Sequence, residues 1–104
     1  MATEIMLHAI CANIGQKEVL SQMKEEAAEL IVAANKARRV SDDLNPTPVS
    51  RLEAEEMLLE EIADLSNCII ALGLDTPRNR LKIKGIMDQK ARRWAERVGV
   101  CWDG

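Results

Sequence analysis

The stretch KEEAAELIVAANK, residues 24–36, is the part of the sequence that decides the fold. Its Leu, Ile, Val and Ala residues predict a helix with a buried face. A second stretch, LLEEIADLSNCII at residues 58–70, has the same character. Both carry acidic residues: Glu25, Glu26 and Glu29 in the first, and Glu60, Glu61 and Asp64 in the second. Carboxylates on a face that a helix needs for its core are costly unless a partner compensates them.

The rest of the chain also favours helices. Phe and Tyr are absent, so Leu, Ile, Val, Ala and Met must fill the core of what the length predicts to be one domain, residues 1–104. Turn formers, such as those of SDDLNPTP at 41–48, separate four segments of helical periodicity. The expected helices are about Thr3–Ile14, Lys17–Arg39, Ser50–Leu72 and Pro77–Val98. Short connections between long helices predict an all-α fold, an antiparallel four-helix bundle.

Two of these helices begin with clear capping signals. Ser50 and Glu53 have the spacing of a capping box, in which each side chain bonds the other residue's free N–H. Thr76 precedes Pro77, which suits an N-cap followed by the first helical position. The tail VCWDG, residues 100–104, is expected to be irregular.

Charge, cysteine content and hydropathy exclude several classes of partner. The net charge of −3 gives no support for nucleic-acid binding. Three cysteines without CxxC spacing are typical of reduced thiols rather than of a disulfide framework. The first residues lack a signal-peptide pattern, and no apolar run is long enough to cross a membrane. We therefore expect a cytoplasmic protein that binds neither nucleic acid nor a membrane.

The acidic residues are expected to lie among apolar ones. On the second helix an apolar stripe runs through Val19, Met23, Leu30 and Ala34. Glu26 falls inside this stripe. On the third helix one face holds Met57, Glu61, Asp64 and Cys68. Apolar positions at helical spacing on the first helix are Ile5, Met6, Ala9, Ile10 and Ile14.

The two acidic motifs are also predicted to lie at the same height. Glu29 lies ten positions before Arg39, and Glu61 lies eleven positions after Ser50. At ~1.5 Å per residue both are roughly 15 Å from the connecting loop, so they are level in an antiparallel hairpin. Like charges brought together in this way either acquire raised pKa values or hold a cation. Ligand sets made only of oxygen suit Mg²⁺ or Mn²⁺.

The motifs themselves resemble those of a known superfamily. EEAAE at 25–29 fits EExxE, and EIAD at 61–64 fits ExxD. This order on successive helices resembles the signature of the all-α nucleoside triphosphate pyrophosphohydrolases. The superfamily includes MazG-type enzymes, dimeric dUTPases, dCTPases and phosphoribosyl-ATP pyrophosphohydrolase. KARRW at 90–94 resembles the basic K-x-x-R ending of MazG-like members, although Asp88 stands where these often have Asn.

The resemblance spans the second to fourth helices and implies an activity and its residues. The reaction is hydrolysis of a nucleoside triphosphate to the monophosphate and pyrophosphate with Mg²⁺, for which Mn²⁺ could substitute. The implied metal ligands are Glu26, Glu29, Glu61 and Asp64. Glu25 would be a further acidic ligand or an orienting base, whereas Glu60 is expected to face solvent.

Basic residues are needed because acidic groups alone would repel a triphosphate. Lys84, Lys90 and Arg93 on the fourth helix are the expected phosphate-binding residues, with Arg capable of bidentate contacts. The residues that could stack on a base are Trp94, Trp102 and His8, although Trp94 is more typical of a core residue. Cys68 could line a base pocket, but a small buried core residue is the simpler interpretation.

Three alternatives remain open from the sequence. The acidic motifs also resemble those of phosphoribosyl-ATP pyrophosphohydrolase. A carboxylate-bridged di-iron or di-manganese bundle would use Glu-x-x-His pairs, and His8 lies outside both motifs. A non-catalytic helical module for nucleotide binding or protein interaction would keep the fold without the activity. Four helices with this much apolar surface predict at least a homodimer, and the resemblance implies a homodimer or homotetramer.

Overall fold

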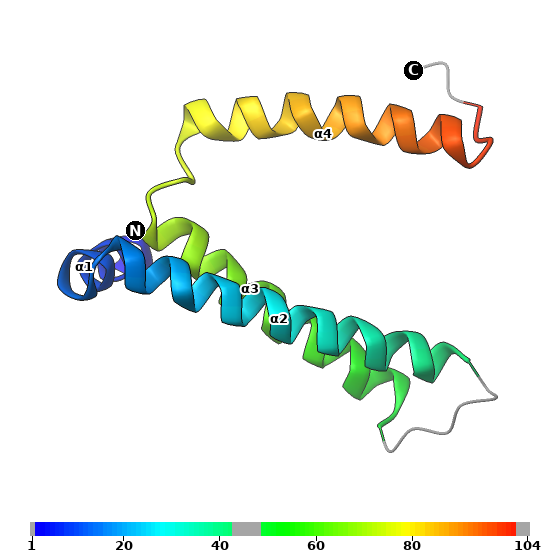
Figure 1. Cartoon of the computed structure of the whole chain (residues 1–104), viewed down its shortest axis with the longest axis horizontal. Coiled ribbons are helices and arrows are strands. Elements are labelled where there is room, and N and C mark those ends of the chain that lie inside the picture. The colour runs from blue at the N-terminus through cyan, green and yellow to red at the C-terminus, as the bar shows by residue number, and fades with distance from the viewer. Residues whose placement is uncertain (1, 43–48, 102–104) are drawn as a thin grey trace. The chain divides into compact units, whose positions relative to one another are not determined.

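A computed structural model describes residues 2–42 and 49–101, and this part of the chain consists of helices without strands. The four helices are α1 (Ala2–Ile14), α2 (Gln16–Ser41), α3 (Arg51–Ala71) and α4 (Pro77–Arg97) (Figure 1). The all-α prediction is therefore confirmed, and each helix end lies within two residues of its predicted position. Most of the predicted 41–48 turn and the end of the tail, 102–104, lie outside the described residues.

The predicted helix starts are confirmed by their hydrogen bonds. The Ser50 Oγ accepts from the Glu53 N–H at 3.1 Å, and the Ser50 N–H donates to Glu53 Oε1 at 3.2 Å. The Thr76 hydroxyl accepts from the Asn79 N–H at 3.1 Å, with Pro77 in the first turn. Gly15 joins α1 directly to α2 at φ 96°, a conformation that other residues rarely adopt. These local signals fix where the helices begin.

The chain divides into two compact units, Met1–Gly73 and Leu74–Gly104, and each is described by itself. In the first unit α2 and α3 form a helical hairpin, and α1 packs against both of them. The second unit contains α4. The arrangement of all four helices as one bundle, and its oligomeric state, stay predictions.

The α2–α3 interface follows a regular seam. On α2 seven buried or half-buried residues follow one another at intervals of four and three, with the half-buried Ala27 and Lys36 beside them: Val19, Met23, Glu26, Leu30, Ala33, Ala37 and Val40. On α3 the same spacing runs through Ala54, Leu58, Glu61, Leu65, Cys68 and Leu72. Such a 3.5-residue repeat is the pattern of coiled-coil packing. On each of the two helices the seam contains one carboxylate, and its other residues are apolar or cysteine.

The seam differs from the predicted stripes on both helices. On α2 it passes through Ala33, which is 3% exposed, whereas the predicted Ala34 is exposed. On α3 it passes through Leu65 rather than Asp64, which lies exposed beside the seam. On α2 the reason is that a seam against a partner helix repeats every 3.5 residues, so a second step of four in succession, from Leu30 to Ala34, leaves it.

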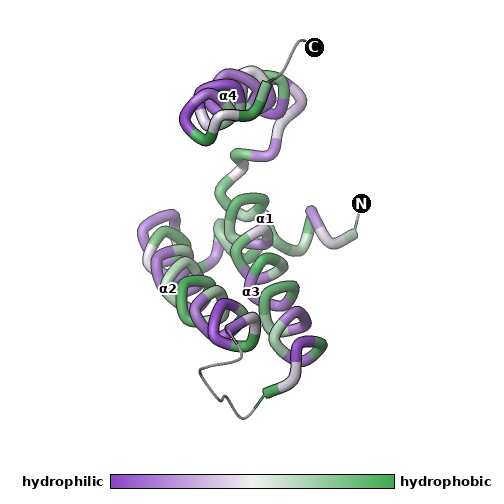
Figure 2. Tube along the Cα trace, turned by 90° about the vertical axis from the view of Figure 1, so that its right-hand side faces the viewer, coloured by the Kyte–Doolittle hydropathy of each residue, from purple (hydrophilic) through white to green (hydrophobic). Residues whose placement is uncertain are grey.

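The core of the first unit lies where α1 meets the hairpin. Leu7, Val19, Cys68 and Ala71 form its buried cluster. The face of α1 that packs here carries Leu7 and the half-buried Cys11, while Ile5, Met6, Ala9, Ile10 and Ile14 are exposed. Figure 2 shows hydrophobic segments alternating with hydrophilic ones along the helices. None of the described helices combines the length and the apolar character needed to cross a bilayer.

Candidate metal centre

Three carboxylates from α2 and α3 converge at one point of the hairpin. Glu26, Glu61 and Asp64 each offer an oxygen atom, and the three atoms lie within 4.8 Å of one another. Glu26 and Glu61 are half-buried seam residues, and Asp64 lies at the exposed edge. We call these three residues the acidic triad. The hairpin thus brings together three of the four ligands expected from the two motifs.

Glu61 is the most constrained member of the triad. Its Oε2 atom is buried and has no hydrogen-bond partner in the described part of the chain. Burial raises the pKa of Glu61 above its ordinary value, and the negative charges of Glu29, Asp64 and Glu26 raise it further. A buried oxygen without a donor is costly, so either a proton or a cation would stabilise it.

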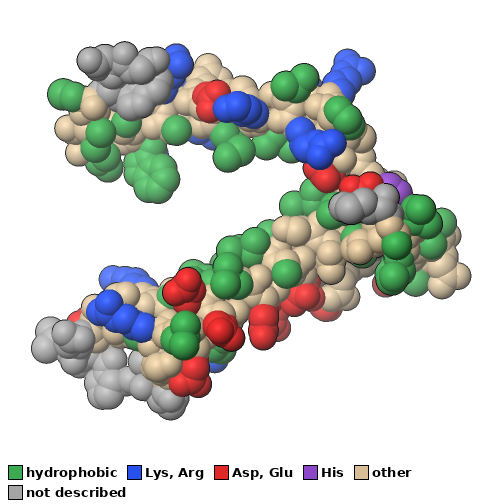
Figure 3. All heavy atoms as spheres, turned by 180° about the vertical axis from the view of Figure 1, so that it is seen from behind, with side chains coloured by type: hydrophobic (Ala, Val, Ile, Leu, Met, Phe, Trp, Pro, Cys, Tyr) green, Lys and Arg blue, Asp and Glu red, His purple; other side chains and the backbone are tan. Residues whose placement is uncertain are grey.

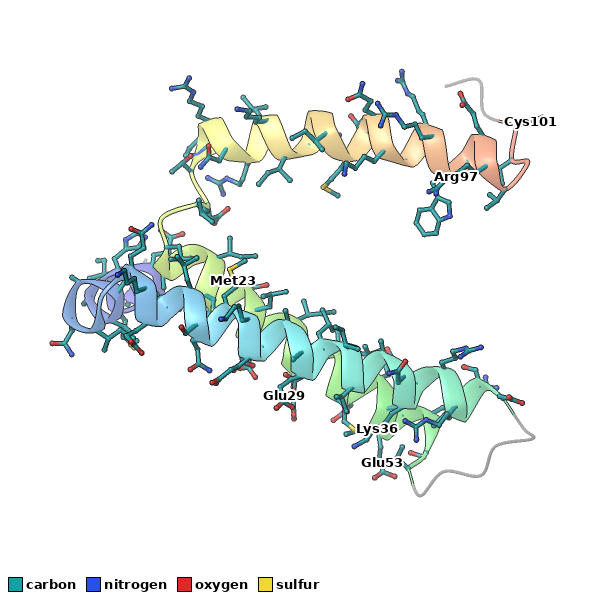
Figure 4. All side chains as sticks on the ribbon, viewed as in Figure 1. Met23, Glu29, Lys36, Glu53, Arg97 and Cys101 are labelled. Carbon is teal, nitrogen blue, oxygen red and sulfur yellow. The ribbon has the colours of Figure 1, made fainter. Side chains whose placement is uncertain are left out.

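The expected fourth ligand, Glu29, lies close to the triad without joining it. Its side chain is exposed. Among the neighbouring charges, that of Glu29 has the largest effect on the pKa of Glu61. In Figure 4 the side chain of Glu29 projects from a different side of α2 than that of Met23.

The other acidic residues of the two motif stretches are exposed to solvent. Glu25 and Glu60 are both exposed, as expected for Glu60, and neither belongs to the triad. Figure 3 shows acidic side chains gathered along one side of the first unit, with hydrophobic side chains on the other. The roles of Glu25 as a ligand or an orienting base stay predictions.

One positioning residue was missed by the sequence analysis. The Gln22 side-chain amide donates a hydrogen bond of 2.7 Å to Oε1 of Glu26. This bond restricts the rotamer of Glu26 and occupies one lone pair on that oxygen. The i, i+4 spacing of the two residues on a helix was the signal that could have identified the pair.

An apolar layer lies next to the triad. Cys68 is 6% exposed and belongs to the core cluster, which confirms the simpler interpretation of this residue. Burial raises the pKa of the Cys68 thiol, and the charges of Glu26 and Asp64 add to the effect. The thiol is therefore protonated at neutral pH, and the potential ligands at this point are oxygens.

The predicted phosphate-binding residues lie on α4, within the second unit. Lys84 is 3.5 Å from Asp88, with which it forms an exposed i, i+4 ion pair. Lys90 lies between Met87 and Trp94 on one face, at intervals of three and four residues. Arg93 is exposed, about 60° away from Lys90 at ~100° per residue. Of the three cations, Lys90 therefore shares the apolar stripe of the helix.

The candidate stacking residues are placed as follows. Trp94 is 64% exposed within its unit, so it is not a core residue of α4 alone. His8 is exposed on α1. Trp102 lies outside the described residues.

The donor set of the triad fits a hard divalent cation. Three carboxylates at one point supply only oxygen atoms, and they leave positions for water or for oxygens of a substrate. The spacing and the uncompensated Glu61 oxygen are the features that a cation would satisfy.

Comparison with known proteins found no family model, no curated protein and no solved structure that matches the chain. The function must therefore be argued from the site.

Proposed function

We propose that the acidic triad binds a divalent metal ion and that the protein is a Mg²⁺-dependent nucleoside triphosphate pyrophosphohydrolase of the MazG-like, all-α type. The observation that carries the proposal is the convergence of three carboxylates from EExxE and ExxD, whose oxygens lie within 4.8 Å of one another, with Glu26 and Glu61 inside an otherwise apolar seam. Ordinary surface acids would not occupy seam positions, because their desolvation opposes folding. The EExxE motif of α2 and the ExxD motif of α3 lie at facing positions, which supports one ligand that both motifs share.

Each residue would contribute a defined part of the activity. Glu26, Glu61 and Asp64 would hold the ion, and Gln22 would orient Glu26. The ion, when bound, would neutralise phosphate oxygens and lower the pKa of a bound water. Glu29, whose charge acts on Glu61, is the candidate for a fourth ligand.

The basic residues would compensate the phosphate charge. Lys90 and Arg93 are the better candidates on α4, because Lys84 already has Asp88 as an ion-pair partner.

A homodimer or homotetramer is part of the proposal. Within its unit, α1 exposes Ile5 and Met6 by 69% and 61%. Exposed large apolar side chains that gather on one surface are typical of interaction sites. Sedimentation velocity over a range of protein concentrations would measure the oligomeric state.

Two measurements on the purified protein test the activity. Calorimetric titration with Mn²⁺ measures metal binding, and pyrophosphate release is measured with every NTP and dNTP and with phosphoribosyl-ATP, with Mg²⁺ or with EDTA. Glu61→Gln should abolish release, whereas Glu56→Gln, an exposed acid on α3 outside the triad, should not. Release from phosphoribosyl-ATP alone would identify that branch. Metal binding without hydrolysis would indicate a binding module, and absence of metal binding would contradict the proposal.

A further inference from the structure

The acidic side of α2 carries one basic residue. Lys36 lies seven positions after Glu29, about 20° from it around the helix at ~100° per residue. The other basic residues of α2 project roughly 110° or more from the mean direction of Glu26 and Glu29. These residues are Lys17, Lys24, Arg38 and Arg39. Figure 4 shows Glu29, Lys36 and Glu53 along the same side of the hairpin.

Lys36 is half-buried and has no ionic partner among the described residues. The residue is half-buried, unlike Lys24, which is exposed. Its ammonium forms no ion pair or hydrogen bond within the part of the chain that the structure describes. A lysine in this situation packs its methylene stem along the protein and presents the charge to solvent. The ammonium is therefore available to an anion from outside.

The distance from the triad to Lys36 suits a chain of phosphates. Lys36 is ten residues beyond Glu26, the triad residue on α2, or about 15 Å along the axis. Side chains on a helix lean toward its N-terminus, so Glu26 and Lys36 lean the same way, and only the greater length of the lysine side chain shortens the gap between them. The remaining gap is too long for one phosphate group that is bound at the triad. It can be bridged by two or three phosphates in a row.

We propose that Lys36 binds the distal phosphate of a polyphosphate chain whose proximal phosphate lies at the acidic triad. This inference rests on the proposed function, and it adds the direction in which the substrate lies along the hairpin. The phosphates would run from the triad toward the α2–α3 connection. The nucleoside would then lie toward Gln22 and the α1 end of the hairpin. The site would select ligands with a phosphate chain over monophosphates, because only the former reach the ammonium.

The test uses inorganic polyphosphates, so it does not depend on identifying the nucleotide. Binding of tripolyphosphate and of orthophosphate to the Mn²⁺-loaded full chain is measured by calorimetry. The variant Lys36→Met keeps the apolar stem and removes the charge, and Lys36→Gln serves if the first does not fold. Lys24→Met is the matched control, an exposed lysine on the opposite flank of α2. Circular dichroism checks that every variant is helical.

We expect Lys36→Met to weaken tripolyphosphate binding by about tenfold or more, the usual effect of losing a charge-assisted hydrogen bond. Orthophosphate and Mn²⁺ binding should change little, and Lys24→Met should behave like the unaltered chain. Equal tripolyphosphate affinities for Lys36→Met and Lys24→Met would overturn the role of Lys36 and leave the metal site standing. Failure of the unaltered chain to bind Mn²⁺ would overturn the proposed function and this inference together.

Discussion

Replacing Glu61 by Gln should have opposite effects on the metal-free and metal-loaded protein. Without metal, the substitution removes a carboxylate whose Oε2 is buried without a partner and whose pKa is raised by burial and by Glu29, Asp64 and Glu26. The amide of Gln can donate to a neighbouring carboxylate, so the metal-free variant should melt at a higher temperature than the unaltered chain. In the metal-loaded protein, by contrast, the variant lacks one of the three charged ligands of the ion.

The effect of metal on the melting temperature can be calculated, because an ion that binds the folded chain stabilises it against unfolding. An ion at 100 times its Kd stabilises the folded chain by about 2.7 kcal/mol. At ~4–8 °C per kcal/mol for a domain of this size, this raises the Tm by roughly 10–20 °C. If the variant binds about 100-fold more weakly, an effect like the larger ones seen at metal sites, the same ion concentration stabilises it by only about 0.4 kcal/mol. The Tm would then rise by roughly 2–3 °C.

Thermal denaturation of both chains with Mn²⁺ and with EDTA measures these four temperatures. Glu56→Gln controls for the loss of one negative charge elsewhere on α3. An equal Mn²⁺-dependent rise for Glu61→Gln and the unaltered chain would refute the metal site. A lower melting temperature for metal-free Glu61→Gln would refute the argument that the Glu61 charge is destabilising.

The same group makes stability depend on pH. A carboxyl with a raised pKa in the folded state binds its proton more tightly there than in the unfolded state. The stability that comes from protonated Glu61 is therefore full below the ordinary glutamate pKa and is lost as pH rises toward the raised value. Metal must displace this proton, so Mn²⁺ affinity should increase over the same interval in the unaltered chain, and by less in Glu61→Gln.

Three further predictions concern stability and reactivity. Ser50→Ala removes the capping box of α3 and should lower the free energy of unfolding by about 1 kcal/mol in urea denaturation, and an unchanged midpoint would contradict the cap. Gly73→Ala places a side chain at φ 73° and should cost about 1–2 kcal/mol in the same assay, because no neighbouring atom is crowded and the strain is in the backbone alone. Iodoacetamide should modify exposed Cys101 well before buried Cys68, as followed by mass spectrometry, and comparable rates would show that the core opens readily.

The helices were predictable because their signals are local. The Ser50–Glu53 box and Thr76 with Pro77 specify helix starts through bonds within a few residues. The acidic motifs could likewise be placed on successive helices and at similar heights, since helical rise is constant. Convergence of Glu26 with Asp64 follows from that geometry once the hairpin forms.

Burial was less predictable because it depends on the partner helix. α1 is apolar around most of its circumference, so its periodicity could not indicate that Leu7 would pack inward while Ile5 and Met6 stay exposed. The choice between Ala33 and Ala34 depended on the 3.5-residue repeat that two packed helices impose on each other.

The sequence by itself determined four helices, their ends, and two acidic motifs on consecutive helices, because capping and helical rise act over a few residues. Only the tertiary structure decided that Glu26 and Glu61 occupy the seam, that Asp64 lies at its edge, and that an oxygen of Glu61 is buried without a partner. The physical reason is that desolvation and the repulsion of like charges arise between helices, and they exist only after the helices have packed.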